Sequence, residues 1–556
     1  MAESVEDLLD TARAWMAVDP DPVTRAELQA LIDAGDTEGL AERFDGRLRF
    51  GTAGIRGVQG AGPNRMNRVV VRRMAAGVGS WIGPGARAVV GYDARPNSDV
   101  YAHDLAAVLA SLGVEAMILP TVVPTPVLAY AVRELRTTVG LMVTASHNPP
   151  ADNGVKVFLA DGAQLRAPHD AEIERSIDAA PLVGPTVDEP LPPGSVTVLD
   201  RYVIDRYVDD IAHSVERPFS GSLMVAYTPL HGVGRATLEA VFDATGLPAP
   251  VVAADQAEPD GTFPTVAFPN PEEPGAMDSL IATAIAAGAD LAIANDPDAD
   301  RLAVALPEGD RWRVLTGDEV GALLADRMLA VTSGPDRIVV STVVCSSLVE
   351  KIATAAGVRH QTTLTGFKWI IGSAYADVRY RPVLAYEESL GYACTADVRD
   401  KDGISAALRF VELTEALAER GITPLRRLDE LAVEHGLHAT RAFSVRFDGA
   451  GAVQAAGAAV DRLRREPPTV LAGRSVTAIE DFAEGGWLPP TNLLRLDLDG
   501  GVRVLMRPSG TEPKTKVYLE AVVAVDDVDA VPEARMQALA MLDGLRGPLT
   551  DGLLAD

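Results

Sequence analysis

The sequence predicts three similar mixed α/β domains followed by a C-terminal α+β domain. Short apolar strands alternate with helical segments through three successive regions, 86–143, 221–304 and 337–413. After residue 435 the pattern changes to strands, helices and a hairpin signal. A chain of 556 residues has room for such an arrangement at about 150 residues per domain. The expected domains are 1–205, 206–312, 313–435 and 436–556.

Apolar runs bounded by turn-forming residues define the elements of the first three domains. The expected strands are 88–92, 139–143, 223–227, 291–294, 338–343 and 383–386. The expected helices, rich in alanine, are 104–112, 277–287 and 346–356. In open α/β sheets, ligands bind beyond the carboxyl ends of the strands, so we expect functional side chains in the loops that follow these strands.

The last domain has a different pattern. We expect a strand at 442–447 and a helix at 450–465. Strands at 493–498 and 502–506 flank Asp-Gly-Gly at 499–501, which predicts a hairpin. A further strand at 516–523 and a closing helix at 531–545 complete this domain. The proline-rich stretch 181–193 is expected to be a loop near the first boundary.

Composition and charge exclude several classes of protein. Lysine and arginine number 50 against 78 acidic residues, a formal net charge of −28 that would repel a nucleic acid backbone. An anionic small substrate would therefore need a locally basic site. Two cysteines exclude a disulfide scaffold, and no export signal or long apolar run is present. We expect a cytoplasmic protein, a monomer or homodimer, without nucleic acid or membrane partners.

The segment 144–149, Thr-Ala-Ser-His-Asn-Pro, follows the apolar strand 139–143 directly. Its serine, Ser146, would project from the end of a buried strand into a loop. The Gly-x-Ser-x-Gly pattern of acyl-transferring hydrolases is absent from the chain. A serine that carries a phosphoryl group is the preferred interpretation. The alternative is a serine that only caps the following turn.

An acidic triplet follows the apolar strand 291–294. Asp296, Asp298 and Asp300 alternate along the chain, and in an extended segment their side chains would share one face. Three carboxylates so close would repel one another, so a hard cation with oxygen ligands, Mg²⁺, is expected. An EF-hand is excluded because Arg301 replaces the glycine and Pro307 replaces the glutamate of that loop. A solvated acidic turn is the alternative.

A basic loop at 507–516, Arg-Pro-Ser-Gly-Thr-Glu-Pro-Lys-Thr-Lys, lies between two expected strands. It combines a guanidinium, hydroxyls, a glycine amide and ammonium groups, which is what a phosphate monoester requires. It is not a Walker A loop, so ATP binding is not implied. The alternative is a solvated basic loop.

Other candidate segments carry weaker signals. Residues 51–57 place three glycines around Arg56, which would permit close approach of a ligand or form an ordinary turn. Segments 366–368 and 387–389 each follow a strand and could bind sugar hydroxyls or be structural turns. Lys156 could shuttle a proton if its pKa is lowered, orient a phosphate by its charge, or lie on the surface.

Together these segments resemble the α-D-phosphohexomutase superfamily of phosphoglucomutases and phosphomannomutases, over nearly the whole chain. The resemblance implies four domains around a central active-site cleft. It implies that Ser146 is the phosphoserine and also a metal ligand with Asp296, Asp298 and Asp300. The other implied catalytic residues are Arg56, His147, Lys156 and Arg301, and the implied substrate-binding residues are Thr365, Gly366, Lys368, Glu387, Ser389, Lys401, Arg507, Ser509, Gly510 and Thr511. Further similar segments are 91–95, 124–126, 268–272 and 400–403.

The resemblance implies conversion of glucose 1-phosphate to glucose 6-phosphate through a bisphosphorylated intermediate, with Mg²⁺ as cofactor and glucose 1,6-bisphosphate as activator. Details at 50–54, 295–297 and 386–392 resemble the branch with phosphoglucomutase-2-like and phosphopentomutase proteins. The histidine that other hexomutases carry after the Glu-x-Ser segment is absent. A mannose or pentose mutase, a non-catalytic sugar-phosphate sensor and a Mg²⁺-dependent phosphatase are the alternatives.

Overall fold

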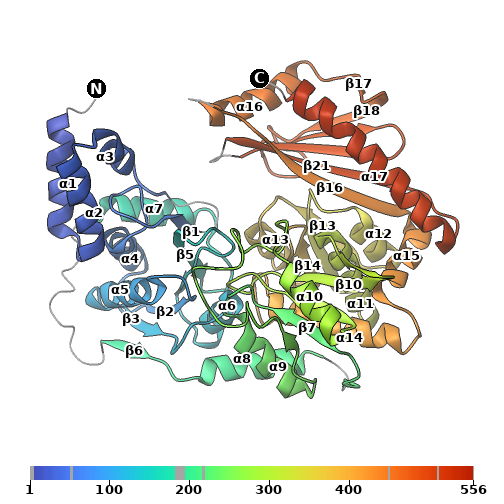
Figure 1. The fold of residues 1–556 in the computed structure, drawn as a ribbon, viewed down its shortest axis with the longest axis horizontal. Helices are drawn as coiled ribbons and strands as arrows, with labels where there is room; N and C mark the ends of the chain where they lie inside the picture. Colours follow the sequence, from blue (N-terminus) through green and yellow to red (C-terminus); the bar gives the residue numbers. More distant parts are fainter. Residues whose placement is uncertain are drawn as a thin grey trace. The chain divides into compact units, whose positions relative to one another are not determined.

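The computed structural model describes residues 5–49, 54–181, 195–215, 219–448, 451–509 and 513–554. The chain divides into two compact units. Unit 1 comprises Met1–Val314 with Ser389–Glu412, and unit 2 comprises Leu315–Glu388 with Leu413–Asp556. Figure 1 labels many of the helices and strands of both units.

The first sheet of unit 1 has six strands in the order β1-β5-β4-β2-β3-β6. Their bounds are β1 Gly54–Val58, β2 Arg87–Tyr92, β3 Glu115–Ile118, β4 Val139–Val143, β5 Asp152–Leu159 and β6 Val196–Val198. Strands β4, β2, β3 and β6 pair in parallel, whereas β5 and β1 are antiparallel additions. All five residues of β4 are buried, so its carboxyl end is held firmly by the core.

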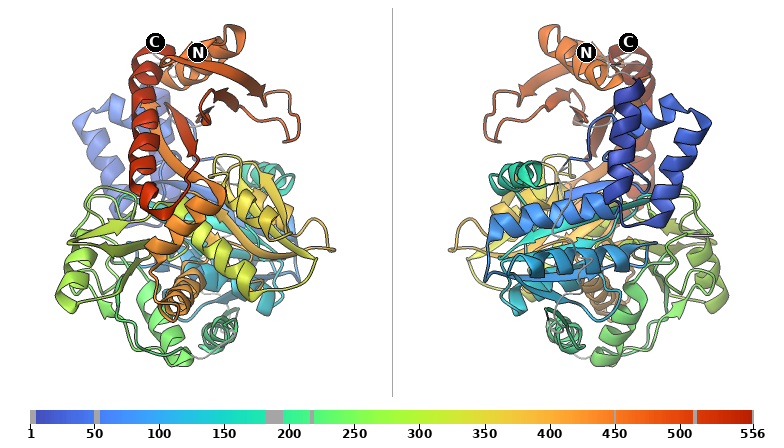
Figure 2. Two further views of the ribbon diagram at one scale, coloured as in Figure 1. Left: turned by 90° about the vertical axis from the view of Figure 1, so that its right-hand side faces the viewer. Right: turned by 90° about the vertical axis from the view of Figure 1, so that its left-hand side faces the viewer.

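Helices cover this sheet. They are α4 (Arg68–Ile82), α5 (Ser98–Ser111), α6 (Thr125–Glu134) and α7 (His169–Ala179). Three further helices, α1 (Val5–Val18), α2 (Pro22–Ala34) and α3 (Thr37–Phe44), precede them and are dark blue in Figure 2. Trp15, Leu28, Leu40 and Val69 share one buried cluster, which joins these three helices to α4. These N-terminal helices were not predicted from the sequence.

The second sheet of unit 1 has five strands in the order β11-β10-β9-β7-β8. Their bounds are β7 Val225–Thr228, β8 Val251–Val252, β9 Leu291–Ala294, β10 Ala303–Glu308 and β11 Arg311–Val314. The helices of this region are α8 (Tyr202–His213), α9 (Gly234–Thr245) and α10 (Asp278–Ala287). Strand β7 pairs in parallel with β8 and with β9, whereas β10 pairs antiparallel with β9 and with β11. This pairing confirms the predicted mixed α/β character.

Unit 2 begins with a third α/β region, in which β13, β12 and β14 pair in parallel. The strands are β12 Arg337–Thr342, β13 Arg359–Thr363 and β14 Arg381–Glu387, and the helices are α11 Gly317–Val331, α12 Leu348–Ala355, α13 Phe367–Ala374 and α15 Pro424–His435. Helix α11 begins with a capping box in which Thr316 and Glu319 satisfy each other's backbone N–H groups. Strand β15 (Gly391–Ala393) lies in the segment grouped with unit 1, and α14 (Gly403–Ala418) leads back into unit 2.

The C-terminal region of unit 2 is an antiparallel sheet in the order β16-β21-β20-β19-β18-β17. Its strands are β16 Leu437–Arg446, β17 Val470–Leu471, β18 Arg474–Asp481, β19 Leu494–Leu498, β20 Val502–Pro508 and β21 Lys514–Val523, with helices α16 Ala452–Arg465, η1 Val528–Ala530, α17 Val531–Gly547 and η2 Pro548–Leu553. Leu498 pairs with Val502 across the predicted hairpin turn, where Gly500 and Gly501 both have positive φ.

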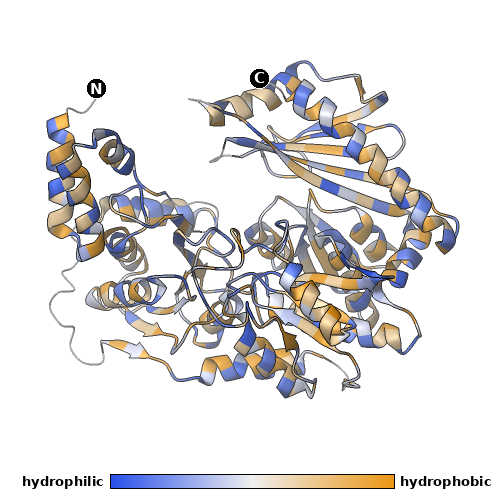
Figure 3. Cartoon of the chain, in the orientation of Figure 1, coloured by the Kyte–Doolittle hydropathy of each residue, from blue (hydrophilic) through white to orange (hydrophobic). Residues whose placement is uncertain are grey.

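Helix α17 of this last region carries both hydrophobic and hydrophilic residues along its length, as its colours in Figure 3 show. Ala538, Leu542 and Leu545 of α17 share one buried cluster with Leu519 of β21. The predicted fold class, three α/β regions and one α+β region, is therefore confirmed. None of the described helices is long and apolar enough to cross a membrane.

Candidate functional site

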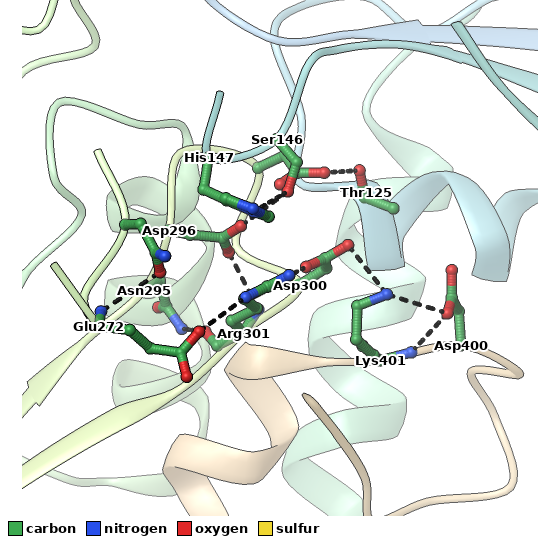
Figure 4. Close-up of polar contacts among 12 residues, drawn as sticks. Thr125, Ser146, His147, Glu272, Asn295, Asp296, Asp300, Arg301, Asp400 and Lys401 are labelled. Carbon is green, nitrogen blue, oxygen red and sulfur yellow. Dashed lines mark hydrogen bonds and ion pairs between the residues drawn. The ribbon is translucent and has the colours of Figure 1, made fainter. Parts of the chain in front are cut away.

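Ser146 lies in the loop that follows β4, and its side chain meets the acidic triplet. The hydroxyl Oγ donates to Asp296 Oδ2 at 3.0 Å and lies 3.2 Å from His147 Nδ1 (Figure 4). Ser146 is 3% exposed and has φ +52°, a left-handed conformation uncommon for a residue with a side chain. Two segments 150 residues apart in the chain thus converge on one hydroxyl.

Asp296, Asp298 and Asp300 follow β9 and converge as well. One oxygen from each carboxylate lies within 4.8 Å of the others, and the three residues are at most 1% exposed. The segment is a tight turn with Ala299 at φ +53°, not the extended chain assumed in the sequence analysis. That assumption was wrong, because the turn and not strand alternation brings the carboxylates together.

The turn is closed by its own residues. Asn295 Nδ2 donates to Arg301 O at 2.6 Å, and Arg301 N donates to Asp296 Oδ1 at 3.0 Å. The hydroxyl of Tyr227, on β7, donates to Asn295 Oδ1 at 3.0 Å. These bonds hold the two ends of the turn together and orient the carboxylate of Asp296.

Two lysines neutralise much of the triplet's charge. Lys156 Nζ, on β5, lies 2.7 Å from both Asp298 Oδ2 and Asp300 Oδ2. Lys401 Nζ lies 3.3 Å from Asp300 Oδ2. Burial alone would lower the pKa of Lys156, but the two carboxylates raise it above its ordinary value. The ammonium therefore stays protonated, which favours the interpretation of Lys156 as an orienting charge over that of a proton shuttle.

The three carboxyl groups differ in their protonation. Burial and the neighbouring carboxylates raise the pKa of Asp296 well above its ordinary value. Burial acts in the same direction on Asp298 and Asp300, and the Asp298 carboxylate adds to it at Asp300. The pKa of each is nevertheless below the ordinary value, because Lys156 acts together with the Thr125 hydroxyl at Asp298 and with Lys401 and Arg301 at Asp300. Only further positive charge would hold all three groups ionised at once.

The donor set fits a hard divalent cation. Within the described part of the chain, Asp298 Oδ1 and Asp300 Oδ1 are buried without a hydrogen-bond partner, although Arg301 Nε approaches Asp300 Oδ1 at 4.0 Å. Buried carboxylate oxygens without donors are costly unless they bind a cation. Oxygen-only ligands at this spacing are typical of Mg²⁺ or Ca²⁺ sites.

His147, Arg56 and Arg301 surround Ser146 and the triplet. Burial lowers the pKa of His147 well below its ordinary value, and the charges of Arg301 and Arg56 lower it further, so its imidazole is neutral. Arg56 donates to Asn148 Oδ1 at 2.7 Å. Arg301 donates to Glu272 Oε2 at 3.2 Å. The site is thus basic around an acidic centre, as an anionic substrate in a protein of net charge −28 requires.

The glycines near Arg56 serve the sheet. Gly54 begins β1, and a Cβ there would lie 2.0 Å from Val155 O of β5. The alternative of an ordinary glycine-rich turn is therefore wrong for residues 54–57, which lie in β1, and close approach of a ligand to this segment stays a prediction. Residues 51–53 lie outside the described part of the chain.

Several predicted substrate-binding residues lie in unit 2. Thr365 and Gly366 precede α13, Lys368 lies in its first turn with Nζ 5.6 Å from the centre of the Trp369 ring, and Glu387 ends β14. Arg507, near the end of β20, donates to Thr365 Oγ1, which brings β20 and the segment before α13 together. Ser509 N donates to Lys514 O at 2.8 Å. Gly510 and Thr511 lie outside the described residues, and Ser389 begins the segment that groups with unit 1.

Sequence reasoning assigned no role to three residues that contact the site. Thr125, at the start of α6, donates its hydroxyl to Asp298 Oδ2, and its N–H donates to Asp298 O at 2.9 Å. Asp400 accepts from Gln164 Nε2 at 2.7 Å and lies 3.6 Å from Lys401 Nζ. Arg95 binds the backbone of the Ser146 loop. Only the resemblance at 91–95, 124–126 and 400–403 pointed to these segments.

Sequence models of the phosphoglucomutase/phosphomannomutase family match four parts of the chain. Its alpha/beta/alpha domains I, II and III match residues 47–182, 205–309 and 316–434, and its C-terminal domain matches residues 455–538. The matches follow one another in the family's order and cover most of the chain.

Curated relatives are similar over most of their length. A probable phosphomannomutase of Haemophilus influenzae is 41% identical over 82% of this chain and 93% of the relative. A phosphoglucomutase of Staphylococcus haemolyticus is 33% identical over 93% of this chain and 97% of the relative. A phosphopentomutase of Mus musculus is 32% identical over 91% of this chain and 89% of the relative.

Proposed function

The chain belongs to the α-D-phosphohexomutase superfamily and is a phosphosugar mutase, and we propose that it interconverts glucose 1-phosphate and glucose 6-phosphate through a phosphoserine at Ser146. One observation carries the proposal: Ser146 Oγ lies 3.0 Å from Asp296, within a buried site that holds a carboxylate triplet and two lysines. A hydroxyl in such surroundings is poised to accept and return a phosphoryl group.

The proposed reaction has two transfers. The bond between phosphorus and Ser146 Oγ breaks as a bond from phosphorus to O6 of glucose 1-phosphate forms, and the proton of O6 passes to Ser146 Oγ, which is left as a hydroxyl. The bond between phosphorus and the C1 oxygen of glucose 1,6-bisphosphate then breaks as a bond from phosphorus to Ser146 Oγ forms, and the proton of that hydroxyl passes to the C1 oxygen. The neutral His147 imidazole, 3.2 Å from Ser146 Oγ, can exchange a proton with that hydroxyl in the dephosphorylated enzyme.

Charge around Ser146 supports both transfers. Lys156, Arg56 and Arg301 place positive charge near the group that carries the developing negative charge. Asp296, Asp298 and Asp300 would hold Mg²⁺, with Ser146 as a further ligand, and this cation would neutralise charge on the phosphoryl oxygens. Glucose 1,6-bisphosphate would prime enzyme whose serine is not phosphorylated.

The remaining site residues are proposed to bind the substrate. Arg507, Ser509, Gly510 and Thr511 would hold the phosphate that does not react, since a guanidinium, hydroxyls and amides suit a monoester. Glu387 and Ser389 would bind the sugar hydroxyls. Thr365, Gly366 and Lys368 would also bind the substrate, since Thr365 Oγ1 accepts from Arg507. Lys401 is proposed to act through Asp300, because its Nζ lies against that carboxylate.

A second candidate is the same reaction on mannose 1-phosphate or on a pentose 1-phosphate. The 41% identity to a probable phosphomannomutase favours mannose, and the similarity to phosphopentomutases favours ribose or deoxyribose. The relatives therefore support the reaction type more firmly than the sugar.

A substrate panel tests the proposal. We expect the highest kcat/KM for glucose 1-phosphate among glucose, mannose and ribose 1-phosphates, with activity dependent on catalytic glucose 1,6-bisphosphate. Ser146→Ala should abolish turnover, whereas Ser111→Ala, at an exposed hydroxyl on α5, should not alter it. Full activity of Ser146→Ala would exclude the phosphoserine mechanism, and net phosphate release would indicate a phosphatase. A higher kcat/KM for mannose or ribose 1-phosphate would reassign the sugar alone.

A further inference from the structure

Arg95, in the loop between β2 and α5, binds the backbone of the Ser146 loop at several points. Its Nη2 donates to the carbonyl oxygens of Ser146 and Asn148, both at 2.6 Å. Its Nη1 donates to the carbonyl oxygens of Pro149 and Asp152 at 2.7 and 3.1 Å. One guanidinium therefore binds three carbonyl groups of the loop between β4 and β5 and the carbonyl group of Asp152, the first residue of β5.

Arg95 is itself held in place. Its side chain is 1% exposed, its backbone N donates to Asp93 Oδ1 at 3.0 Å, and its Nε lies 3.5 Å from Asp93 Oδ2. The guanidinium also lies over the Phe263 ring, 4.8 Å from its centre. A Cβ at Gly261 would lie 2.4 Å from Arg95 Cα, so the neighbouring loop leaves no room for Arg95 to shift.

The Ser146 loop needs such support for two reasons. Ser146 has a left-handed backbone that a residue with a side chain adopts only where its surroundings impose it. The four carbonyl groups turn toward a common point, where their dipoles would repel one another without a cation between them. The planar fork of an arginine can satisfy this arrangement, whereas the single ammonium of a lysine cannot reach all four acceptors.

We infer that Arg95 is a positioning residue of the phosphoryl transfer, which holds Ser146 in the conformation that directs Oγ at Asp296. This inference rests on the proposed phosphoserine function. Arg95 contacts the backbone of the loop and acts through Ser146 without touching substrate. Its loss should therefore slow the transfer while substrate binding is preserved.

Arg95→Lys tests the inference because it keeps the charge and removes the fork. We expect kcat to fall on the order of 100-fold, as for a reacting group displaced by about 1 Å. The rate at which glucose 1,6-bisphosphate phosphorylates Ser146, followed by intact mass in a quenched-flow experiment, should fall in parallel. KM for the sugar 1-phosphate should change by less than about threefold.

Arg409→Lys is the matched control. Arg409 is another buried arginine of unit 1, 5% exposed, which donates to Ser214 O and Glu412 Oε2. Both Arg95→Lys and Arg409→Lys should lower the melting temperature of the protein. Arg409→Lys should nevertheless leave kcat within about twofold of the wild type. A kcat of Arg95→Lys within threefold of the wild type, or a raised KM with unchanged kcat, would overturn the inference.

Hydrogen exchange on the wild-type protein decides the matter if Arg95→Lys does not fold. The amide hydrogens of Ser146, Asn148 and Asp152, which donate to Thr144 Oγ1, Ala145 O and Pro149 O, should exchange as slowly as those of β4, because Arg95 holds this loop rigid. Exchange at the rate of a free loop would overturn the inference. If instead the wild-type serine accepts no phosphoryl group, the proposed function fails and not the role of Arg95 alone.

Discussion

Replacement of Lys156 by methionine removes the charge that compensates two buried carboxylates. Lys156 Nζ lies 2.7 Å from both Asp298 Oδ2 and Asp300 Oδ2, and its side chain is 5% exposed. Methionine has nearly the same length, so the change leaves little empty space. It leaves Asp298 with the Thr125 hydroxyl and Asp300 with Lys401.

The expected cost follows from this geometry. Removal of one partner from a buried ion pair destabilises a protein by about 3–5 kcal/mol, because the other charge stays buried without compensation. At an unfolding entropy of about 2.1 cal/mol/K per residue, such a loss in a chain of 556 residues corresponds to a drop in melting temperature of about 3–4 °C. The deficit should narrow as the pH falls from 7 toward 4. Without Lys156 the folded-state pKa values of Asp298 and Asp300 rise, so the folded variant takes up protons at a higher pH than the folded wild type. This proton uptake stabilises the folded variant relative to the wild type as the pH falls.

The assay is thermal and urea denaturation of the wild type and the variant, each with and without MgCl₂. Mg²⁺ bound at the triplet would restore positive charge, so it should stabilise Lys156→Met by about 2–3 kcal/mol at 100 times its Kd. Lys351→Met, which removes an exposed lysine of α12, is the control and should change stability by less than about 0.5 kcal/mol. A loss for Lys156→Met as small as that of the control would refute the reasoning. A difference in stability between the variant and the wild type that grows as the pH falls would refute it as well.

Tyr227→Phe should destabilise the protein by about 1–3 kcal/mol in urea denaturation, because Asn295 Oδ1 loses a buried donor at 3.0 Å. Tyr202→Phe, at a 54% exposed tyrosine, is its control, and equal losses would contradict the account. Burial and then Glu387 raise the pKa of Glu388 to about 7, so the contribution of this carboxyl to the stability of the wild type should be lost as the pH rises from about 4.5 to about 7. Glu388→Gln should remove this loss and raise the free energy of unfolding by about 2 kcal/mol at pH 8. This gain is smaller than the full pKa shift implies, because the carboxyl is partly exposed to water. An unchanged pH profile of unfolding in this variant would show that Glu388 ionises normally.

The strand pattern predicted the elements that carry chemistry because these strands are buried and apolar. Strands β4 and β9 lie at the predicted residues, and the loops that follow them hold Ser146 and the triplet. Both loops therefore followed from the rule that functional side chains lie beyond strand ends. The short distance between the two loops could not be predicted, because β4 and β9 belong to different sheets and no sequence pattern shows how those sheets pack.

Other features gave weak or misleading signals. Strand β5, which carries Lys156, begins with Asp-Asn-Gly, a turn-like sequence, so no strand was expected there. Strand β18 has mostly polar, exposed residues, and its place in the sheet depends on pairing with β19. Thr125 and Arg95 act through hydrogen bonds to distant segments, which no local pattern reveals.

The central claim is that Ser146 accepts a phosphoryl group and returns it to the sugar. Enzyme incubated with glucose 1,6-bisphosphate labelled with ³²P should carry the label on the peptide that contains Ser146. A chase with unlabelled glucose 1-phosphate should move that label into hexose phosphate at a rate no slower than kcat. Label that stays on the protein during the chase, or that enters hexose phosphate equally well in Ser146→Ala, would contradict the account.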